Sequence, residues 1–202
     1  MPRLGRLHIP GGCYHVMGRG LERRRIFGSS EDKEDFLERL GSALAKVQAQ
    51  CLAWAVMPNH YHLLVQVGTE LLSYLMSPLL SGYASAYNRR HKRSGYVFQN
   101  RYKSILCDAD AYLLQLVRYI HLNPLKANIV DSLARLNTYP WTGHATLMGK
   151  SHCAWQETAT VFKLFGEGTV RTLRNRYHKF LAEDVAASVS HNLSGGGLIR
   201  SY

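Results

Sequence analysis

The stretch CLAWAVMPNHYHLLVQV, residues 51–67, contains two β-favouring runs separated by a Pro-Asn pair. Proline and asparagine favour tight turns, so the pattern predicts a β-hairpin. Side chains alternate between the two faces of a strand, which puts His60 and His62 on one face and Tyr61 on the other. Two neighbouring histidines can ligate one metal ion or can form a solvated, hydrogen-bonded pair, and the spacing alone leaves both interpretations open.

The segments around this hairpin alternate between strand-like and helical periodicity. The helical segments carry apolar residues at helical spacing, with acids near a start or cations near an end. We expect strands at 13–18 and 96–107, and helices at 31–49, 70–92 and 109–123. The helix at 70–92 is expected to break or restart near Pro78. The helix at 109–123 is expected to begin after Asp108 as a cap and to end at Pro124.

The order of these elements predicts an α+β fold, with helices packed on one face of an antiparallel sheet. The pattern changes after Trp141, where the chain becomes basic and helical and then rich in serine and glycine. We therefore expect a domain at 1–145, followed by a basic helical C-terminal extension at 146–202 with a Gly-rich tail.

The composition points to a polyanionic partner, because 25 Lys and Arg face 14 Asp and Glu in 202 residues, a net charge of +11. No apolar run is long enough to span a membrane and the N-terminus lacks the apolar core of a signal peptide, so we expect a soluble, cytoplasmic protein without a membrane partner. The four cysteines are scattered without a CxxC pair, which favours reduced, mostly buried thiols.

The segment VRYIHLNP, residues 117–124, places Tyr119 and Asn123 four residues apart. On a helix they lie one above the other and offer a phenol and an amide oxygen to the same volume. This arrangement would suit a hydroxyl nucleophile beside a metal ligand. Taken alone, the pair is also consistent with a rim aromatic and a helix stop before proline.

Basic residues cluster near aromatic ones, a combination that can neutralise phosphates and stack on unpaired bases. The alternative is a solvated basic helix end beside ordinary sheet aromatics. The aromatic residues are Tyr87, Tyr96, Phe98 and Tyr102. The candidate DNA-binding cations are Arg19, Arg23, Arg24, Arg25, Arg89, Arg90, Lys92, Arg93, Arg101 and Lys103.

Four motifs in order resemble the HUH single-tyrosine transposases, most closely the group associated with repeated extragenic palindromic (REP) elements. They are YHVMGRG (14–20), WAVMPNHYHLLV (54–65), VFQNRYKS (97–104) and LVRYIHLNPLKANIV (116–130), and the resemblance spans roughly residues 8–145. It implies a ferredoxin-like fold in which the HUH pair, His60 and His62, faces a helix carrying the nucleophile Tyr119. By position, Asn123 would be the third metal ligand.

The resemblance implies a metal-dependent DNA transposase that cleaves and rejoins single-stranded, hairpin-containing DNA through a 5′-phosphotyrosyl intermediate. A phenol is a poor nucleophile at neutral pH, so it would need help from a base or a cation. The implied cofactor is Mg²⁺ or Mn²⁺, between which the ligands do not decide.

The implied partners are DNA hairpins of REP type, bound by a monomer or a homodimer. Two alternatives remain: a non-catalytic binder of structured single-stranded DNA with a regulatory role, and a metal-dependent phosphodiesterase that uses water.

Overall fold

The computed structural model describes residues 8–107 and 110–193. Its centre is a four-stranded antiparallel sheet with the order β2-β3-β1-β4. The strands are β1 (Cys13–Arg19), β2 (Gln50–Met57), β3 (His60–Gln66) and β4 (Lys103–Cys107). The helices are η1 (Leu21–Arg23), α1 (Ser30–Lys46), α2 (Leu72–Arg90), α3 (Asp110–Lys126), α4 (Leu133–Leu136), α5 (His144–Leu147), α6 (Thr158–Lys163) and α7 (Val170–Leu193). The predicted α+β class with an antiparallel sheet is confirmed.

The hairpin and the first helix form where the sequence predicts them. Strands β2 and β3 pair antiparallel from Met57 opposite His60 outward, so the Pro-Asn pair makes the turn. Helix α1 begins with a capping box, in which Ser29 accepts from the backbone N–H of Asp32 and the Asp32 carboxylate accepts from that of Ser29. The helix ends at Lys46 and Gln48 takes a left-handed backbone conformation, φ 51°, which prevents its continuation.

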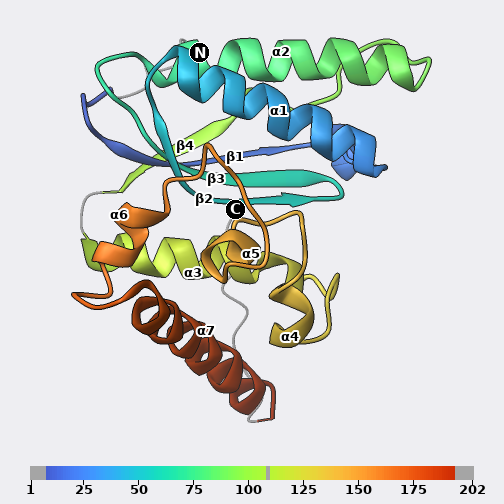
Figure 1. The fold of residues 1–202 in the computed structure, drawn as a ribbon. Coiled ribbons are helices and arrows are strands. Elements are labelled where there is room, and N and C mark those ends of the chain that lie inside the picture. Colours follow the sequence, from blue (N-terminus) through green and yellow to red (C-terminus); the bar gives the residue numbers. More distant parts are fainter. Residues whose placement is uncertain (1–7, 108–109, 194–202) are drawn as a thin grey trace.

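Helices cover both faces of the sheet (Figure 1). Helices α1 and α2 enclose one hydrophobic core with Val16, Tyr61 and Leu63, whereas α3 and α7 enclose a second core with Leu64 on the opposite face. The prediction that the helices lie on one face holds for α1 and α2 and is wrong for α3. The physical reason is that both faces of β2 and β3 carry apolar side chains, so each face requires a cover.

Two prolines lie inside helices that the sequence predicts to break or end. Helix α2 runs through Pro78 and helix α3 runs through Pro124, so both predictions are wrong. A proline inside a helix costs about 3 kcal/mol. The buried faces of the two helices, which include Leu75 and Leu79 on α2 and Val117 and Ile120 on α3, bury enough apolar surface to offset this. The expected cap Asp108 lies outside the described residues.

The predicted strand at 96–107 is ladder-paired only as β4, residues 103–107. Before β4, the chain follows the end of β1 without continuous pairing: Gln99 N–H donates to Arg19 O and Leu21 N–H donates to Val97 O. A single bridge joins Phe98 to Gly20. These contacts replace the sheet ladder and leave 99–102 as a loop beside the end of β1.

The C-terminal region is helical, as predicted, and it packs on the sheet. Backbone bridges from Thr142 to Ala55 and from Gln156 to Cys51 hold it along β2, while Tyr177 of α7 is fully buried in the second core. The Gly-rich tail at 194–202 lies outside the described residues. Among the helices of the described ranges, none is long and apolar enough to cross a membrane.

The cysteines are less buried than the sequence pattern predicts. Cys51 is buried, and Cys13, Cys107 and Cys153 are only partly so. Cys13 and Cys107 lie directly opposite each other on β1 and β4, a pairing that depends on strand register and was therefore not visible in their sequence spacing.

Candidate functional site

The two central strands place polar residues on the sheet face that α3 covers. In the antiparallel register, Arg19 lies opposite His60 and Met17 lies opposite His62. Directly opposed residues share a face, so these four side chains point the same way. Tyr61 points to the other face, where it is fully buried and packs against Phe36.

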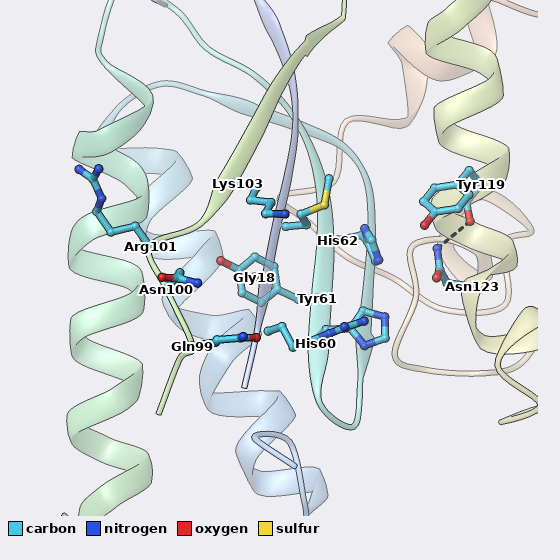
Figure 2. Close-up of a pocket in the computed structure, with 12 residues that line it drawn as sticks. Gly18, His60, Tyr61, His62, Gln99, Asn100, Arg101, Lys103, Tyr119 and Asn123 are labelled. Atoms are coloured by element: carbon cyan, nitrogen blue, oxygen red, sulfur yellow. Dashed lines mark hydrogen bonds between the residues drawn. The ribbon is translucent and has the colours of Figure 1, made fainter. Parts of the chain in front are cut away.

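A cavity of about 300 Å³ opens between this sheet face and α3. Figure 2 shows His60 and His62 on β3 facing Tyr119 and Asn123 on α3. Tyr61 of β3 also borders the cavity. The remaining lining residues come from β1 and from the segment before and at the start of β4: Met17, Gly18, Arg19, Gln99, Asn100, Arg101 and Lys103. The four residues singled out by the HUH-like motif and the Tyr-Asn pair thus line one cavity.

Each histidine is oriented through its Nδ1 atom. His60 Nδ1 lies 2.7 Å from Asn59 Oδ1, and since that oxygen can only accept, Nδ1 carries the proton and Nε2 presents a lone pair. His62 Nδ1 lies 3.0 Å from His15 Nε2, with the two rings stacked at 5.2 Å. Both Nε2 atoms are therefore outside these orienting contacts.

His15 is a site residue that sequence reasoning missed. It is buried, 5% exposed, and its ring centroid lies 6.0 Å from that of Tyr119. The alternation in the segment CYHVMG places His15 and Met17 on one face of a strand. That signal could not identify His62 as the partner, because the pairing of β1 with β3 joins residues 47 positions apart.

All three histidines are held in their neutral form. Burial lowers the pKa of His15 to about 4, and burial together with the charge of Arg19 lowers that of His60 to about 4. Burial, and then the neighbouring His15, His60 and Arg19, hold the pKa of His62 well below its usual range. Neutral imidazole is the form that ligates metal ions.

Tyr119 and Asn123 lie on the face of α3 that looks at the histidines. The ring centroids of Tyr119 and His62 are 5.5 Å apart, nearly perpendicular. Asn123 Nδ2 donates to the backbone oxygen of Tyr119 over 2.9 Å, which fixes the amide and leaves its Oδ1 as an acceptor. The described residues contain no cluster of three His, Cys, Asp or Glu arranged for a metal ion. Two imidazoles and one amide oxygen form a different donor set.

Nine of the ten candidate DNA-binding cations separate into three groups. Arg19, Arg101 and Lys103 line the cavity. Arg23, Arg24 and Arg25 are exposed after β1, with Arg24 paired to Glu22 at 2.6 Å. Arg89 and Lys92 are exposed at the end of α2, where the Arg93 guanidinium lies 5.8 Å from the centre of the Tyr87 ring.

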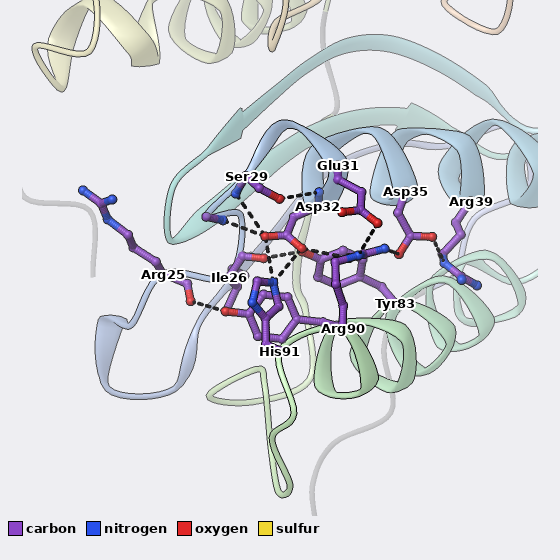
Figure 3. A network of polar contacts seen from close by, with 12 residues as sticks. Arg25, Ile26, Ser29, Glu31, Asp32, Asp35, Arg39, Tyr83, Arg90 and His91 are labelled. Carbon is purple, nitrogen blue, oxygen red and sulfur yellow. Dashed lines mark hydrogen bonds and ion pairs between the residues drawn. The ribbon is translucent and has the colours of Figure 1, made fainter.

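Arg90 occupies a different environment from its neighbours in sequence. Its guanidinium contacts Glu31 at 2.9 Å, Asp32 at 2.8 Å and Asp35 at 3.3 Å, and so joins α2 to α1 (Figure 3). His91 also contacts the buried Asp32 carboxylate, at 2.9 Å. Arg90 is thereby engaged with carboxylates, and the structure does not bring it together with the cavity cations.

The aromatic residues near the basic segments are mostly buried. Tyr87 and Tyr102 belong to the first core and Phe98 packs against Tyr61, whereas the Tyr96 ring is 83% exposed. Tyr96 lines a groove of about 720 Å³ between α2 and residues 95–102. This groove shares Gln99, Asn100 and Arg101 with the cavity, so the two spaces adjoin.

Comparisons with known proteins were consistent with this architecture. Residues 10–123 match the family described as "Transposase IS200 like". A solved REP-associated tyrosine transposase bound to a REP hairpin has a similar fold, with a TM-score of 0.59 at 14% identity, over 78% of this chain and 98% of that one. A putative transposase from Deinococcus radiodurans R1 matches with a TM-score of 0.41 at 17% identity, over 59% of this chain and 95% of that one. No curated protein matches the chain.

Proposed function

The chain belongs to the IS200-like transposases, and we propose that it cleaves and rejoins single-stranded DNA with Tyr119 as the nucleophile. The observation that carries the proposal is the position of the Tyr119 ring, whose centroid lies 5.5 Å from that of His62 across a solvent-accessible cavity. A hydroxyl in a cavity lined by two neutral imidazoles and three cations has the surroundings that phosphoryl transfer needs.

The donor atoms fit a divalent ion, Mg²⁺ or Mn²⁺. His60 and His62 would hold it through Nε2, with Asn123 Oδ1 as the third ligand. For His62 this requires the proton on Nδ1, donated to His15 Nε2 over 3.0 Å, so His15 would carry its own proton on Nδ1. When bound, the ion supplies positive charge that polarises the scissile phosphate.

The arrangement of these residues supports an in-line attack of Tyr119 on the scissile phosphate. The Tyr119 oxygen forms a bond to phosphorus while the bond from phosphorus to the 3′ oxygen of the preceding nucleotide breaks. The 5′ phosphate then stays on Tyr119. The departing 3′ oxygen takes up, through solvent, the proton that the phenol releases, so the leaving strand ends in a 3′ hydroxyl. Attack by the 3′ hydroxyl of another strand reverses these steps and rejoins DNA without ATP.

The cavity and the adjoining groove support a path for the substrate strand. Arg19, Arg101 and Lys103 would neutralise phosphates at the site. Tyr96, 83% exposed in the groove, would stack on an unpaired base. The similar solved structure is described as bound to a REP hairpin, and we infer hairpins of this kind as the substrate. A transposase acting on such DNA would work in the cytoplasm.

A cleavage assay tests the proposal. Labelled single-stranded hairpins made from repeats that flank the gene are incubated with the protein and Mn²⁺ or Mg²⁺ and resolved on a denaturing gel. We expect a product with protein on its 5′ end, lost with EDTA and in Tyr119→Phe. Tyr112→Phe, a more exposed tyrosine of the same helix, is the matched control and should cleave normally. Binding without cleavage on every flanking repeat would favour the non-catalytic binder instead.

A further inference from the structure

Helix α7 contacts the helix that carries Tyr119 through a buried hydrogen-bond chain. The hydroxyl of Tyr177 on α7 lies 2.9 Å from Nδ1 of His121, two residues after Tyr119, and 2.6 Å from Nδ1 of His144 on α5. His144 Nε2 lies 2.8 Å from Asn137 Oδ1. Tyr177, His121 and His144 are all fully buried.

The donor and acceptor roles along this hydrogen-bond chain follow from its last acceptor, Asn137 Oδ1. Asn137 Oδ1 accepts only, so His144 carries its proton on Nε2 and its Nδ1 accepts from the Tyr177 hydroxyl. The Tyr177 oxygen in turn accepts from Nδ1–H of His121. The hydroxyl is therefore donor and acceptor at once, and a ring without it leaves two buried imidazole nitrogens unpaired.

A second set of contacts joins the same two helices on either side of Tyr119. The Arg118 guanidinium lies 4.3 Å from the centre of the Phe180 ring and 3.4 Å from the Asp184 carboxylate. Lys126, at the end of α3, lies 3.0 Å from the same carboxylate. Helix α7 thus contacts α3 at Arg118, His121 and Lys126. Tyr119 and Asn123 of α3 face the cavity instead.

We propose that α7 positions the nucleophile helix against the histidine pair and that Tyr177 is the positioning residue of this contact. The inference rests on the proposed function in that it takes Tyr119 as the nucleophile. It gives the C-terminal extension a role in the reaction: α3 contacts the sheet through apolar side chains, whose burial is non-directional, and the directional hydrogen bonds to Tyr177 fix its register. A displacement of about 1 Å at a reacting group can lower a rate by about two orders of magnitude.

The test compares two buried tyrosines that each lose one hydroxyl. Tyr177→Phe removes the hub of the chain on α7. Tyr83→Phe removes an equally buried hydroxyl, bonded to Ile26 O, in the core on the other sheet face. Full-length proteins are compared by single-turnover cleavage of the hairpin, by hairpin affinity and by amide hydrogen exchange in α3. Asp184→Asn, which removes the charge facing Arg118 and Lys126, provides a second variant.

We expect Tyr177→Phe to lower the cleavage rate about tenfold or more, to leave hairpin affinity within about twofold, and to speed exchange in α3. Tyr83→Phe should do none of this at a matched loss of thermal stability, and Asp184→Asn should show the Tyr177→Phe effects more weakly. Unchanged cleavage and exchange in Tyr177→Phe would overturn the inference, as would equal losses in both tyrosine variants.

The exchange measurement separates the two proposals. If the parent protein does not cleave, the proposed function fails, and exchange in α3 still decides whether Tyr177 holds that helix. Unchanged exchange in α3 of Tyr177→Phe overturns the positioning role whatever the parent's activity.

Discussion

The two faces of the sheet use their polar residues in opposite ways. On the face under α1 and α2, the buried Asp32 carboxylate accepts from Arg90, His91 and backbone N–H groups, and it lines neither the histidine cavity nor the adjoining groove (Figure 3). On the face under α3, His60 and His62 each use Nδ1 in an orienting hydrogen bond, and both rings line a cavity with Nε2 outside that bond (Figure 2). Satisfied polar groups stabilise a fold, and groups left half-satisfied at a cavity are available for chemistry.

The largest effect on stability is expected on the sheet face under α1 and α2, here called the closed face; the face under α3, which borders the cavity, is the open face. Asp32→Asn removes the charge that Arg90 and His91 contact and should lower the free energy of unfolding by about 3 kcal/mol, because it leaves a partly buried cation without its best partner. Denaturant unfolding measures this. Asp35→Asn, a more exposed neighbour in the same network, is the control and should cost about 1 kcal/mol. A lower cleavage rate in folded Asp32→Asn protein would contradict the claim that the polar residues of this face serve stability alone.

A change on the open face should affect metal binding instead. His15→Asn removes the ring that orients His62 and should weaken Mn²⁺ binding by roughly 10- to 100-fold, the usual effect of losing a partner of a metal ligand. Titration calorimetry with Mn²⁺ measures it without DNA. His91→Asn, on the closed face, should leave Mn²⁺ affinity unchanged. Equal affinities for His15→Asn and the parent would remove His15 from the site.

The buried histidine of the α7 contact predicts an acid-sensitive stability. Burial, and then the charge of His178, lower the pKa of His144 from 6.5 to about 3. The unfolded chain therefore binds a proton that the folded protein excludes, so stability falls as pH decreases below 6.5. At pH 5 this group alone should cost about 2 kcal/mol. His144→Gln should show a pH dependence shallower by about one proton, and an unchanged slope would contradict the buried neutral assignment.

The smallest expected effect is on the salt dependence of hairpin binding, and it distinguishes the cavity residue Arg101 from the carboxylate-bound Arg90. Arg101→Ala at the cavity should reduce the salt dependence of hairpin binding by roughly 0.7 in the log–log slope, the value for one phosphate on a single strand. Arg90→Ala should lower stability and leave that slope unchanged. Binding measured across a series of salt concentrations distinguishes them, and a reduced slope in Arg90→Ala would return this residue to the DNA-binding set.

Local sequence patterns predicted the helices and strands better than they predicted the environment of individual side chains. Alternation and the Pro-Asn turn predicted the hairpin, and apolar residues at helical spacing, with acids near the start, predicted α1. The Tyr119 and Asn123 pair needed only helical geometry to be placed on one face. By contrast, Arg89 and Arg90 are identical and adjacent in sequence, and only the packing of α2 on α1 decides that one is exposed and the other engaged.

Long-range pairing explains what the sequence could not predict. His15 meets His62 because β1 inserts beside β3, and Tyr177 meets His121 because α7 folds back over α3. Neither contact leaves a periodic signal in the chain. The same holds for the continuation of α3 through Pro124, which depends on the buried apolar surface of that helix.

The most direct test of the account is to identify the residue that carries DNA after cleavage. The protein is incubated with hairpin DNA and Mn²⁺, digested with a protease and a nuclease, and the nucleotide-linked peptide is sequenced by mass spectrometry. The account predicts a phosphodiester on Tyr119, absent in Tyr119→Phe and present in Tyr112→Phe. A 5′ phosphate on another tyrosine, or cleaved DNA with no linked peptide, would contradict it.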